Sequence, residues 1–189
     1  IGRKTAEENV DALIAGGAQN IELMLDGIAW DSFETRMDEL VAMLLKKNVT
    51  YSIHSPVWDI NLTSENAQMR RAVLDCYKAS ILFGHKLGAA SVVLHPGFCR
   101  APTFDKELAK KRAKESILEL AKYNRPFGCQ LLVENVGNKR TGIFTYPEFI
   151  HFLDGMPSCV NYLVDLGHAH LCGWDSAALI KTLGNRLKA

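Results

Sequence analysis

Short apolar segments alternate with longer segments of helical periodicity along almost the whole chain. Strands are expected at 20–25, 49–54, 91–95, 130–134 and 162–165. Six helices are expected at about 5–16, 31–47, 64–87, 105–123, from 145 onward, and 175–183, with Thr5 and Asp31 near the starts of the first two. Because each nearly continuous apolar strand is followed by a helix, the pattern predicts a parallel sheet covered by helices. No linker or low-complexity stretch interrupts it, so we interpret residues 1–189 as one domain.

The spacing of the expected strands restricts the sheet to two architectures. Successive strands begin about 30 to 40 residues apart, which suits an open doubly wound sheet or a (β/α)8 TIM barrel. Eight units typically need about 250 residues, whereas this chain has 189. It opens with a helix, and a further strand is expected to begin at 186–189. In the barrel interpretation the first strand and the last two βα units are therefore missing.

The composition excludes several classes of protein. The chain has 22 Lys and Arg against 21 Asp and Glu, a net charge of +1, so it offers little attraction to a polyanion such as nucleic acid. Its apolar runs are far shorter than the roughly 18 to 20 residues of a membrane span, and we expect a cytoplasmic protein with no membrane partner. The five cysteines form no Cys-x-x-Cys pair, which predicts reduced, mostly buried thiols and no cysteine-based zinc site.

Polar side chains able to bind a metal follow four consecutive strands. They are His54, His95, Glu134 and Asp165, with His168 three residues further on. Parallel α/β folds build their sites at the carboxyl ends of the strands. In an open sheet, four neighbouring strand ends spread over roughly 14 Å, because strands lie about 4.8 Å apart. Closing the sheet turns these ends toward a common centre, so the pattern favours a barrel.

The residue types at these positions favour a transition metal. Imidazole and carboxylate donors without a thiolate suit Zn or Mn, with Co, Fe or Mg as alternatives. Glu134 and Asp165 each follow apolar residues, where a carboxylate is costly to bury unless it is paired or bound to a cation. The alternatives without a metal are structural: His54 and His95 are hydrogen-bonded polar groups of the fold, and Asp165 caps a loop.

Four motifs resemble those of a known superfamily. They are His54-Ser55-Pro56 followed by Asn61-Leu62, then Leu94-His95-Pro96-Gly97, Val133-Glu134-Asn135 and Val164-Asp165-Leu166-Gly167-His168. Their order and spacing over nearly the whole chain resemble the xylose isomerase-like TIM barrels. That superfamily includes sugar-phosphate isomerases and epimerases and the endonuclease IV-like enzymes of AP endonuclease family 2.

The resemblance implies two alternative metal sites. In the pattern of the one-metal sugar epimerases, Glu134 and Asp165 are ligands and His168 contacts a substrate oxygen. In the endonuclease IV-like pattern His54, His95, Glu134, Asp165 and His168 all bind a multi-zinc cluster. Both families take further His and Glu ligands from the seventh and eighth strands. Those ligands have no counterpart here, so we expect the site of this chain to be incomplete.

At two places this sequence departs from the motifs of the epimerases and of the endonuclease IV-like enzymes. Arg140 stands where the tagatose and psicose 3-epimerases have a second Glu, which argues against that narrow group. Val57-Trp58-Asp59 stands where endonuclease IV-like enzymes place a Tyr that wedges into DNA. The near-neutral charge also argues against a phosphate-rich substrate.

These observations predict a metal-dependent sugar, sugar-phosphate or polyol isomerase or epimerase of carbohydrate metabolism. Glu134 and His168 are its expected catalytic residues, and the expected substrate-binding residues are His54, Trp58, His95, Lys139 and Arg140. The alternative is a zinc-dependent hydrolase of apurinic or apyrimidinic DNA that uses the same ligands. A third alternative is a metal-free binding module on a degenerate barrel. The sequence does not specify the sugar, and it is compatible with a homo-oligomer.

Overall fold

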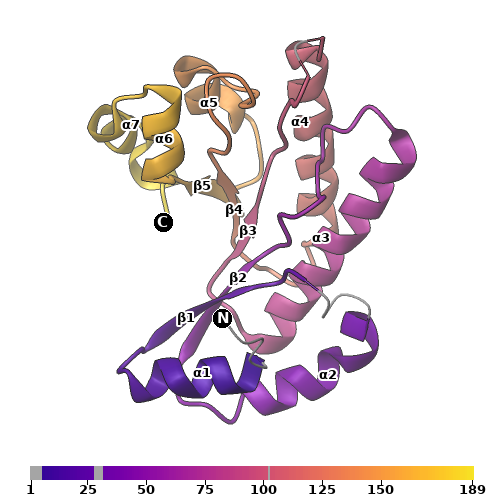
Figure 1. The fold of residues 1–189 in the computed structure, drawn as a ribbon, viewed down its shortest axis with the longest axis vertical. Coiled ribbons are helices and arrows are strands. Elements are labelled where there is room, and N and C mark those ends of the chain that lie inside the picture. Colours follow the sequence, from indigo (N-terminus) through magenta and orange to yellow (C-terminus); the bar gives the residue numbers. More distant parts are fainter. Residues whose placement is uncertain (1–5, 28–31, 102) are drawn as a thin grey trace.

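Five parallel strands form a sheet in the order of the sequence. The computed structural model describes residues 6–27, 32–101 and 103–189. The strands are β1 (Asn20–Met24), β2 (Thr50–His54), β3 (Val92–Leu94), β4 (Leu131–Glu134) and β5 (Val160–Leu163), each paired with the next. The order β1-β2-β3-β4-β5 is the order of neighbouring strands in a TIM barrel. The chain therefore forms a partial barrel, as the strand-end residues predicted (Figure 1).

The helices lie outside the curved sheet and begin and end close to the expected positions (Figure 1). They are α1 (Ala6–Ala15), α2 (Phe33–Leu44), α3 (Ala67–Leu87), α4 (Lys106–Tyr123), α5 (Tyr146–Phe152), α6 (Leu166–Cys172) and α7 (Ser176–Leu183). Thr5 and Asp31 lie outside the described residues. A short 3-10 turn, η2 (Gly184–Arg186), follows α7.

The prediction of six helices was wrong, because it missed α6. This helix has only seven residues and too few apolar positions for a helical period to be visible. Its start also corrects the last strand, expected at 162–165. The strand ends at Leu163, and the Asp165 carboxylate accepts a hydrogen bond from the His168 amide, which makes Asp165 the N-cap of α6.

The last described residues continue the sheet beyond β5. Leu187 forms an isolated parallel bridge with Tyr162, and two backbone hydrogen bonds flank it, from Lys188 N to Tyr162 O and from Val164 N to Ala189 O, both at 3.0 Å. The pairing begins beside β5 at the point where the sequence predicted a further strand.

The two faces of the sheet differ in chemistry. The face toward the helices is apolar, and Gly84 in α3 lets this helix approach closely, because a Cβ there would lie 2.8 Å from Val92 Cγ2. The opposite face of β1 and β2 carries two pairs of polar partners at matched register, Asn20 with Thr50 and Glu22 with Ser52, followed by Met24 with His54. His54 thus ends a polar row on the inner face of the barrel.

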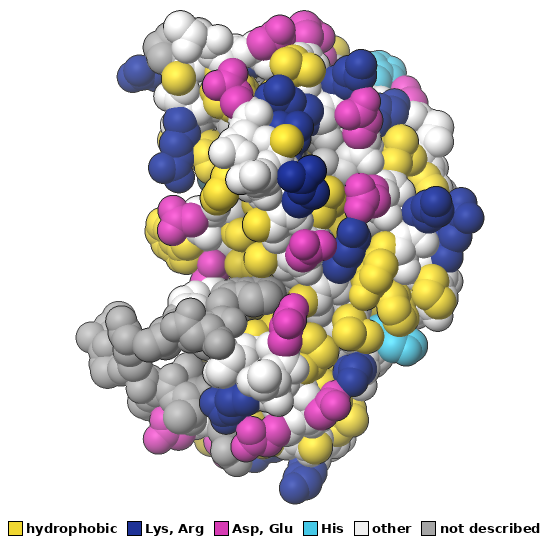
Figure 2. All heavy atoms as spheres, turned by 90° about the vertical axis from the view of Figure 1, so that its right-hand side faces the viewer, with side chains coloured by type: hydrophobic (Ala, Val, Ile, Leu, Met, Phe, Trp, Pro, Cys, Tyr) yellow, Lys and Arg dark blue, Asp and Glu magenta, His cyan; other side chains and the backbone are white. Residues whose placement is uncertain are grey.

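The outer face of the helices carries a mixed surface. Lys and Arg side chains alternate with Asp and Glu on the face shown in Figure 2, with hydrophobic side chains between them. Of the five cysteines, Cys99 and Cys129 are buried and the other three are partly buried, all as free thiols. None of the helices in the described parts of the chain is long and apolar enough to cross a membrane.

Helices α4 and α5 are joined by an ion pair that gives a pH-dependent prediction. Lys110 Nζ lies 2.5 Å from Glu148 Oε1, and Glu148 Oε2 accepts hydrogen bonds from the amide and hydroxyl of Thr145, the N-cap of α5. Burial acts to raise the pKa of Glu148, but the Lys110 ammonium and the Thr145 donors outweigh it and lower the pKa to about 2. The folded state therefore favours the ionised carboxylate.

We expect the stabilisation lost in Glu148→Gln to be largest above pH 4.5 and to fade as the pH falls toward 2. A carboxyl whose folded pKa is depressed stabilises the protein above its unfolded pKa and loses that contribution as it is protonated in the folded state. Because the side chain is 37% exposed, solvent screening limits the effect to about 1 kcal/mol or less. Urea unfolding of both proteins from pH 7 to 3 measures it. Glu107→Gln is the control, since Glu107 also binds Lys110 but is 84% exposed, and an equal pH dependence there would contradict the prediction.

Candidate metal centre

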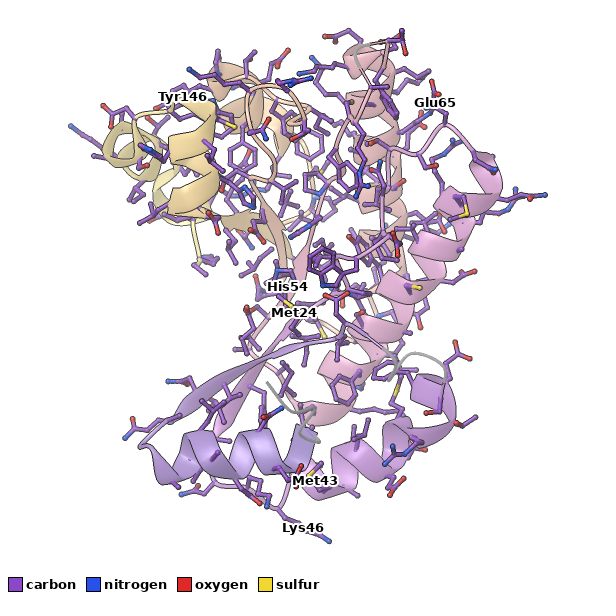
Figure 3. All side chains as sticks on the ribbon, viewed as in Figure 1. Met24, Met43, Lys46, His54, Glu65 and Tyr146 are labelled. Atoms are coloured by element: carbon purple, nitrogen blue, oxygen red, sulfur yellow. The ribbon has the colours of Figure 1, made fainter. Side chains whose placement is uncertain are left out.

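Five potential metal ligands meet where the parallel strands end. His54 and Glu134 are the last residues of β2 and β4, His95 follows β3, Asp165 caps α6 and His168 lies in its first turn. They form two groups, one of His54, His95 and Glu134 and one of Glu134, Asp165 and His168. Within each group the ligand atoms lie within 4.8 Å of one another. Figure 3 shows His54 beside Met24, its register partner on β1, near the middle of the molecule.

The first group is centred on one carboxylate oxygen. Glu134 Oε2 lies 3.2 Å from His54 Nε2 and 3.1 Å from His95 Nε2, and Glu134 is only 5% exposed. Two ligands that share a tetrahedral zinc with bonds of about 2.05 Å lie about 3.3 Å apart. The two nitrogen–oxygen distances therefore match those between ligands of one cation.

The hydrogen bond on the other side of His54 determines what its Nε2 can do. Nδ1 lies 2.8 Å from the carbonyl oxygen of Ser55, which can only accept, so Nδ1 carries the proton. In the neutral imidazole Nε2 then has a lone pair that faces the Glu134 carboxylate. A second proton on the ring, or a cation between the two atoms, removes this repulsion.

Charge and burial act against each other in this group. Burial acts to raise the pKa of Glu134, but the hydrogen bonds with His54 and His95 outweigh it and lower the pKa to about 2. Burial also acts to lower the pKa of His54, and its contacts with Glu134 and the Ser55 carbonyl outweigh this and raise it. Glu134 is therefore ionised, and the site stabilises positive charge beside it.

In the second group, Asp165 and His168 each keep one ligand atom that makes no hydrogen bond to the described residues. Asp165 Oδ1 accepts the His168 amide at 2.6 Å, which leaves Oδ2 available. His168 Nδ1 donates to the Gly137 carbonyl at 2.9 Å, which leaves the lone pair of Nε2 available. Metal-binding histidines typically hold their other ring nitrogen in this way. Asp165 is therefore a helix cap and still has an oxygen for a cation.

Asn135 fixes the spacing of the two carboxylates, a role that the sequence analysis missed. Its side chain is 2% exposed and donates to the Asp165 carbonyl at 2.9 Å, while its Oδ1 accepts the Asp165 amide at 2.7 Å. The pair of bonds joins the residue after Glu134 to the backbone of Asp165. An amide directly after a strand-end carboxylate is the only sequence signal for this role.

Replacing Asn135 with alanine is expected to weaken metal binding by about 10- to 100-fold, the effect typical of residues that orient ligands. The loss of both hydrogen bonds should also lower the free energy of unfolding by about 1–3 kcal/mol, because the part-buried amide and carbonyl of Asp165 lose their partners. Zinc titration calorimetry and urea unfolding measure the two effects. The control is Asn161→Ala, a buried amide on β5 that bonds Gln130 and Ser158. Equal loss of affinity in both variants would mean that Asn135 acts only through general stability.

Asp26 holds the loop after β2, a further role that was not predicted from the sequence. Its carboxylate accepts the amides of Val57, at 3.0 and 3.2 Å, and Trp58, at 3.1 Å. The Trp58 residue is 71% exposed. Asp26 follows β1 by two residues, so its position after a strand end was the available signal.

Lys139 and Arg140 lie apart from the two ligand groups in their described contacts. The Lys139 side chain lies against Gly173 and lines a hollow that contains none of the five ligand residues. Arg140 is exposed, and its amide donates to Asn138 Oδ1 at 2.9 Å. Their predicted contacts with substrate, like that of Trp58, remain predictions.

Several known proteins are similar to this chain in sequence or in fold. An uncharacterized protein of Methanocaldococcus jannaschii, MJ1614, is 27% identical over 167 residues, which make up 87% of this chain and 60% of that protein. The structure of D-psicose 3-epimerase with D-tagatose from Clostridium cellulolyticum H10 has a TM-score of 0.81 at 19% identity, over 98% of this chain and 66% of the epimerase. The structure of the IOLI protein with a bound zinc atom has a TM-score of 0.75 at 16% identity, over 93% of this chain and 63% of that one.

The length covered and the matching family model agree with the five-stranded partial barrel described above. The chain spans about three fifths of the curated relative's length, in line with a sheet of five strands. The family model described as the xylose isomerase-like TIM barrel matches residues 10–189. The chain belongs to the xylose isomerase-like TIM barrel family.

Proposed function

We propose that the protein containing this chain is a metal-dependent sugar isomerase or epimerase. The observation that carries the proposal is the group of Glu134, Asp165 and His168 at the carboxyl ends of neighbouring strands, with its ligand atoms within 4.8 Å of one another. The sugar epimerase among the similar structures supports the substrate class. The zinc atom in the IOLI structure supports zinc as the metal, with manganese, cobalt or iron as alternatives and magnesium least suited to the imidazole donors.

The residues of the site have two roles, which are to bind the metal and to interact with the protons of the substrate. A bound divalent ion supplies stabilisation for negative charge that develops on neighbouring substrate oxygens. Glu134 holds the ion through its carboxylate, which is ionised because its pKa is depressed. With the ion held by Glu134 and Asp165, His168 Nε2 stays free to hydrogen-bond a substrate hydroxyl, because its other ring nitrogen donates to the Gly137 carbonyl. We assign proton transfer at carbon to Glu134 as well, the catalytic role that the sequence predicts for it.

Solvent deuterium exchange tests the proposal directly. The protein loaded with zinc or manganese is incubated in D2O with a panel of ketoses, sugar phosphates and polyols, and the carbon-bound deuterium is measured by NMR. The expected result is incorporation at the carbon next to the carbonyl of at least one substrate, abolished by chelation. Metal uptake without exchange across the panel would contradict the proposed activity. Absence of metal uptake would favour a metal-free binding module.

A second candidate function follows from the sharing of Glu134 by both ligand groups. A carboxylate between two sets of ligands can bridge two cations, and paired cations about 3.5–4 Å apart stabilise phosphodiester hydrolysis. The candidate is cleavage of DNA at abasic sites. Trp58 is the available wedge, but Asp59 follows it directly and repels phosphate. Two zinc ions per chain together with nicking of abasic duplex DNA, both lost in Glu134→Gln, would favour this function over isomerisation.

A further inference from the structure

A separate hollow of about 380 Å³ lies between the start of α4, the loop that leads into α5, and the end of α6. Its volume is within the range of small-molecule sites, about 300–1,000 Å³. Figure 3 labels Tyr146, the first residue of α5, which forms part of its wall. None of the five candidate metal ligands lines it.

Cationic groups from distant parts of the chain meet in this hollow. Its charged lining consists of Lys106, Lys110 and Lys139 together with the carboxylates of Glu107 and Glu148. Lys110 lies 2.5 Å from both Glu107 and Glu148, so its charge is compensated by two carboxylates. Within the described parts of the chain the Lys139 ammonium has no hydrogen bond or ion pair. Lys106 donates to the Gly142 carbonyl at 2.8 Å and has no carboxylate partner among the described residues.

A partly buried thiol, Cys172, lines the same hollow as both uncompensated lysines. Burial raises the pKa of Cys172, and the charges of Lys106 and Lys139 oppose that change. The charges of both lysines therefore act on this thiol. The Lys139 side chain lies against the backbone of Gly173, which has no side chain of its own. A Cβ at Gly173 would lie 2.9 Å from Lys139 Cε and 3.1 Å from its Nζ.

The remaining wall is aromatic. Trp174 and Tyr146 meet edge to face, with ring centroids 6.1 Å apart, and both are only partly buried. Phe149 packs against Trp174, with ring centroids 5.6 Å apart. A flat ring can stack on such a wall, and two ammonium groups attract an anion with several acceptor oxygens.

We propose that this hollow binds a small phosphomonoester that carries a flat ring. The phosphate lies between Lys106 and Lys139, and the ring lies against Trp174 and Tyr146. This site shares no lining residue with the ligand groups, so the proposal does not rest on the metal centre or on the proposed isomerase activity.

Phenyl phosphate is the probe for this site. We expect saturable binding at millimolar or lower concentration, measured by calorimetry and by a change in tryptophan fluorescence. Lys139→Met and Lys106→Met should each weaken binding about tenfold or more, because each removes a charge-assisted contact. Inorganic phosphate should bind more weakly than phenyl phosphate, and phenol should not compete. Lys139→Glu should abolish binding, and circular dichroism confirms that each variant is folded.

The matched control is Lys111→Met. Lys111 lies on α4 beside Lys110 and lines a neighbouring groove, and it is not part of this hollow. Its replacement is expected to leave the affinity unchanged. An equal loss in Lys111→Met would mean attraction to the net charge of the surface and would overturn the proposal. Unchanged affinity in folded Lys139→Met, or no binding up to about 10 mM phenyl phosphate, would also overturn it.

Discussion

Replacing Glu134 with glutamine is expected to abolish metal binding at both ligand groups, because this residue is their only shared member. The amide keeps the shape of the side chain but removes the negative charge that two imidazoles face at 3.1 and 3.2 Å. We expect the affinity for zinc to fall by more than the roughly 10- to 100-fold typical of residues that only orient ligands. Zinc titration calorimetry and metal analysis after dialysis measure the change.

Thermal unfolding gives an independent measure of the same effect. A ligand that binds only the folded state raises its stability by about 2.7 kcal/mol at a concentration 100 times the Kd. Zinc should therefore raise the melting temperature of the unmodified chain and leave that of Glu134→Gln unchanged.

The control for this prediction is Glu22→Gln. Glu22 lies on the same face of the sheet, on β1, and accepts a hydrogen bond from Ser52 at 3.3 Å, but it belongs to neither ligand group. Its replacement should leave zinc binding within a few-fold of the original value. If Glu134→Gln still bound zinc as tightly as Glu22→Gln, the ligand groups described here would not be the metal centre.

Replacing Gly97 with alanine is expected to destabilise the fold by about 3–5 kcal/mol, since backbone strain and overpacking each cost about 1–3 kcal/mol. Gly97 has a φ of 118°, which side-chain-bearing residues rarely adopt. A Cβ there would lie 2.5 Å from Thr63 Cγ2 and 2.8 Å from Asn61 Oδ1. That Asn61 oxygen accepts the amides of Thr63 and Phe98, so the clash would break the contact between the loops after β2 and β3. Urea unfolding measures the loss.

The Gly88→Ala variant measures the cost of backbone strain in the absence of a steric clash. Gly88 ends α3 with a φ of 66°, and a Cβ there would meet nothing within 4 Å. Its replacement should cost only the left-handed backbone penalty of about 1–2 kcal/mol. Similar losses in the two variants would mean that Gly97 is required for its φ alone and not for the contact with Asn61 and Thr63.

The sequence predicted the order of elements well where the signal was long and periodic. Long helices such as α3 and α4 and the apolar run before Glu134 lie close to their expected positions. It failed at α6, where a seven-residue helix depends on the Asp165 cap and on packing against the loop at Gly137. A segment this short is only marginally helical by itself, so tertiary contacts determine its structure.

The sequence likewise predicted the residues of the candidate site better than their geometry. His54, His95, Glu134, Asp165 and His168 were identified because they are polar residues after apolar strands. Asn135 and Asp26 were missed, because their roles are hydrogen bonds to backbone groups of other strands or loops, about 30 residues away. Nothing local in the sequence indicates those partners.

By itself, then, the sequence determined the parallel α/β architecture and the chemistry of the ligands, because both follow from local periodicity and residue type. Only the tertiary structure decided that both imidazoles contact the same oxygen of Glu134 and that Lys139 lines a different hollow. Those facts depend on how the sheet curves and on how loops from different strands pack. The curvature and the packing arise from contacts between residues far apart in the sequence, and no local pattern encodes them.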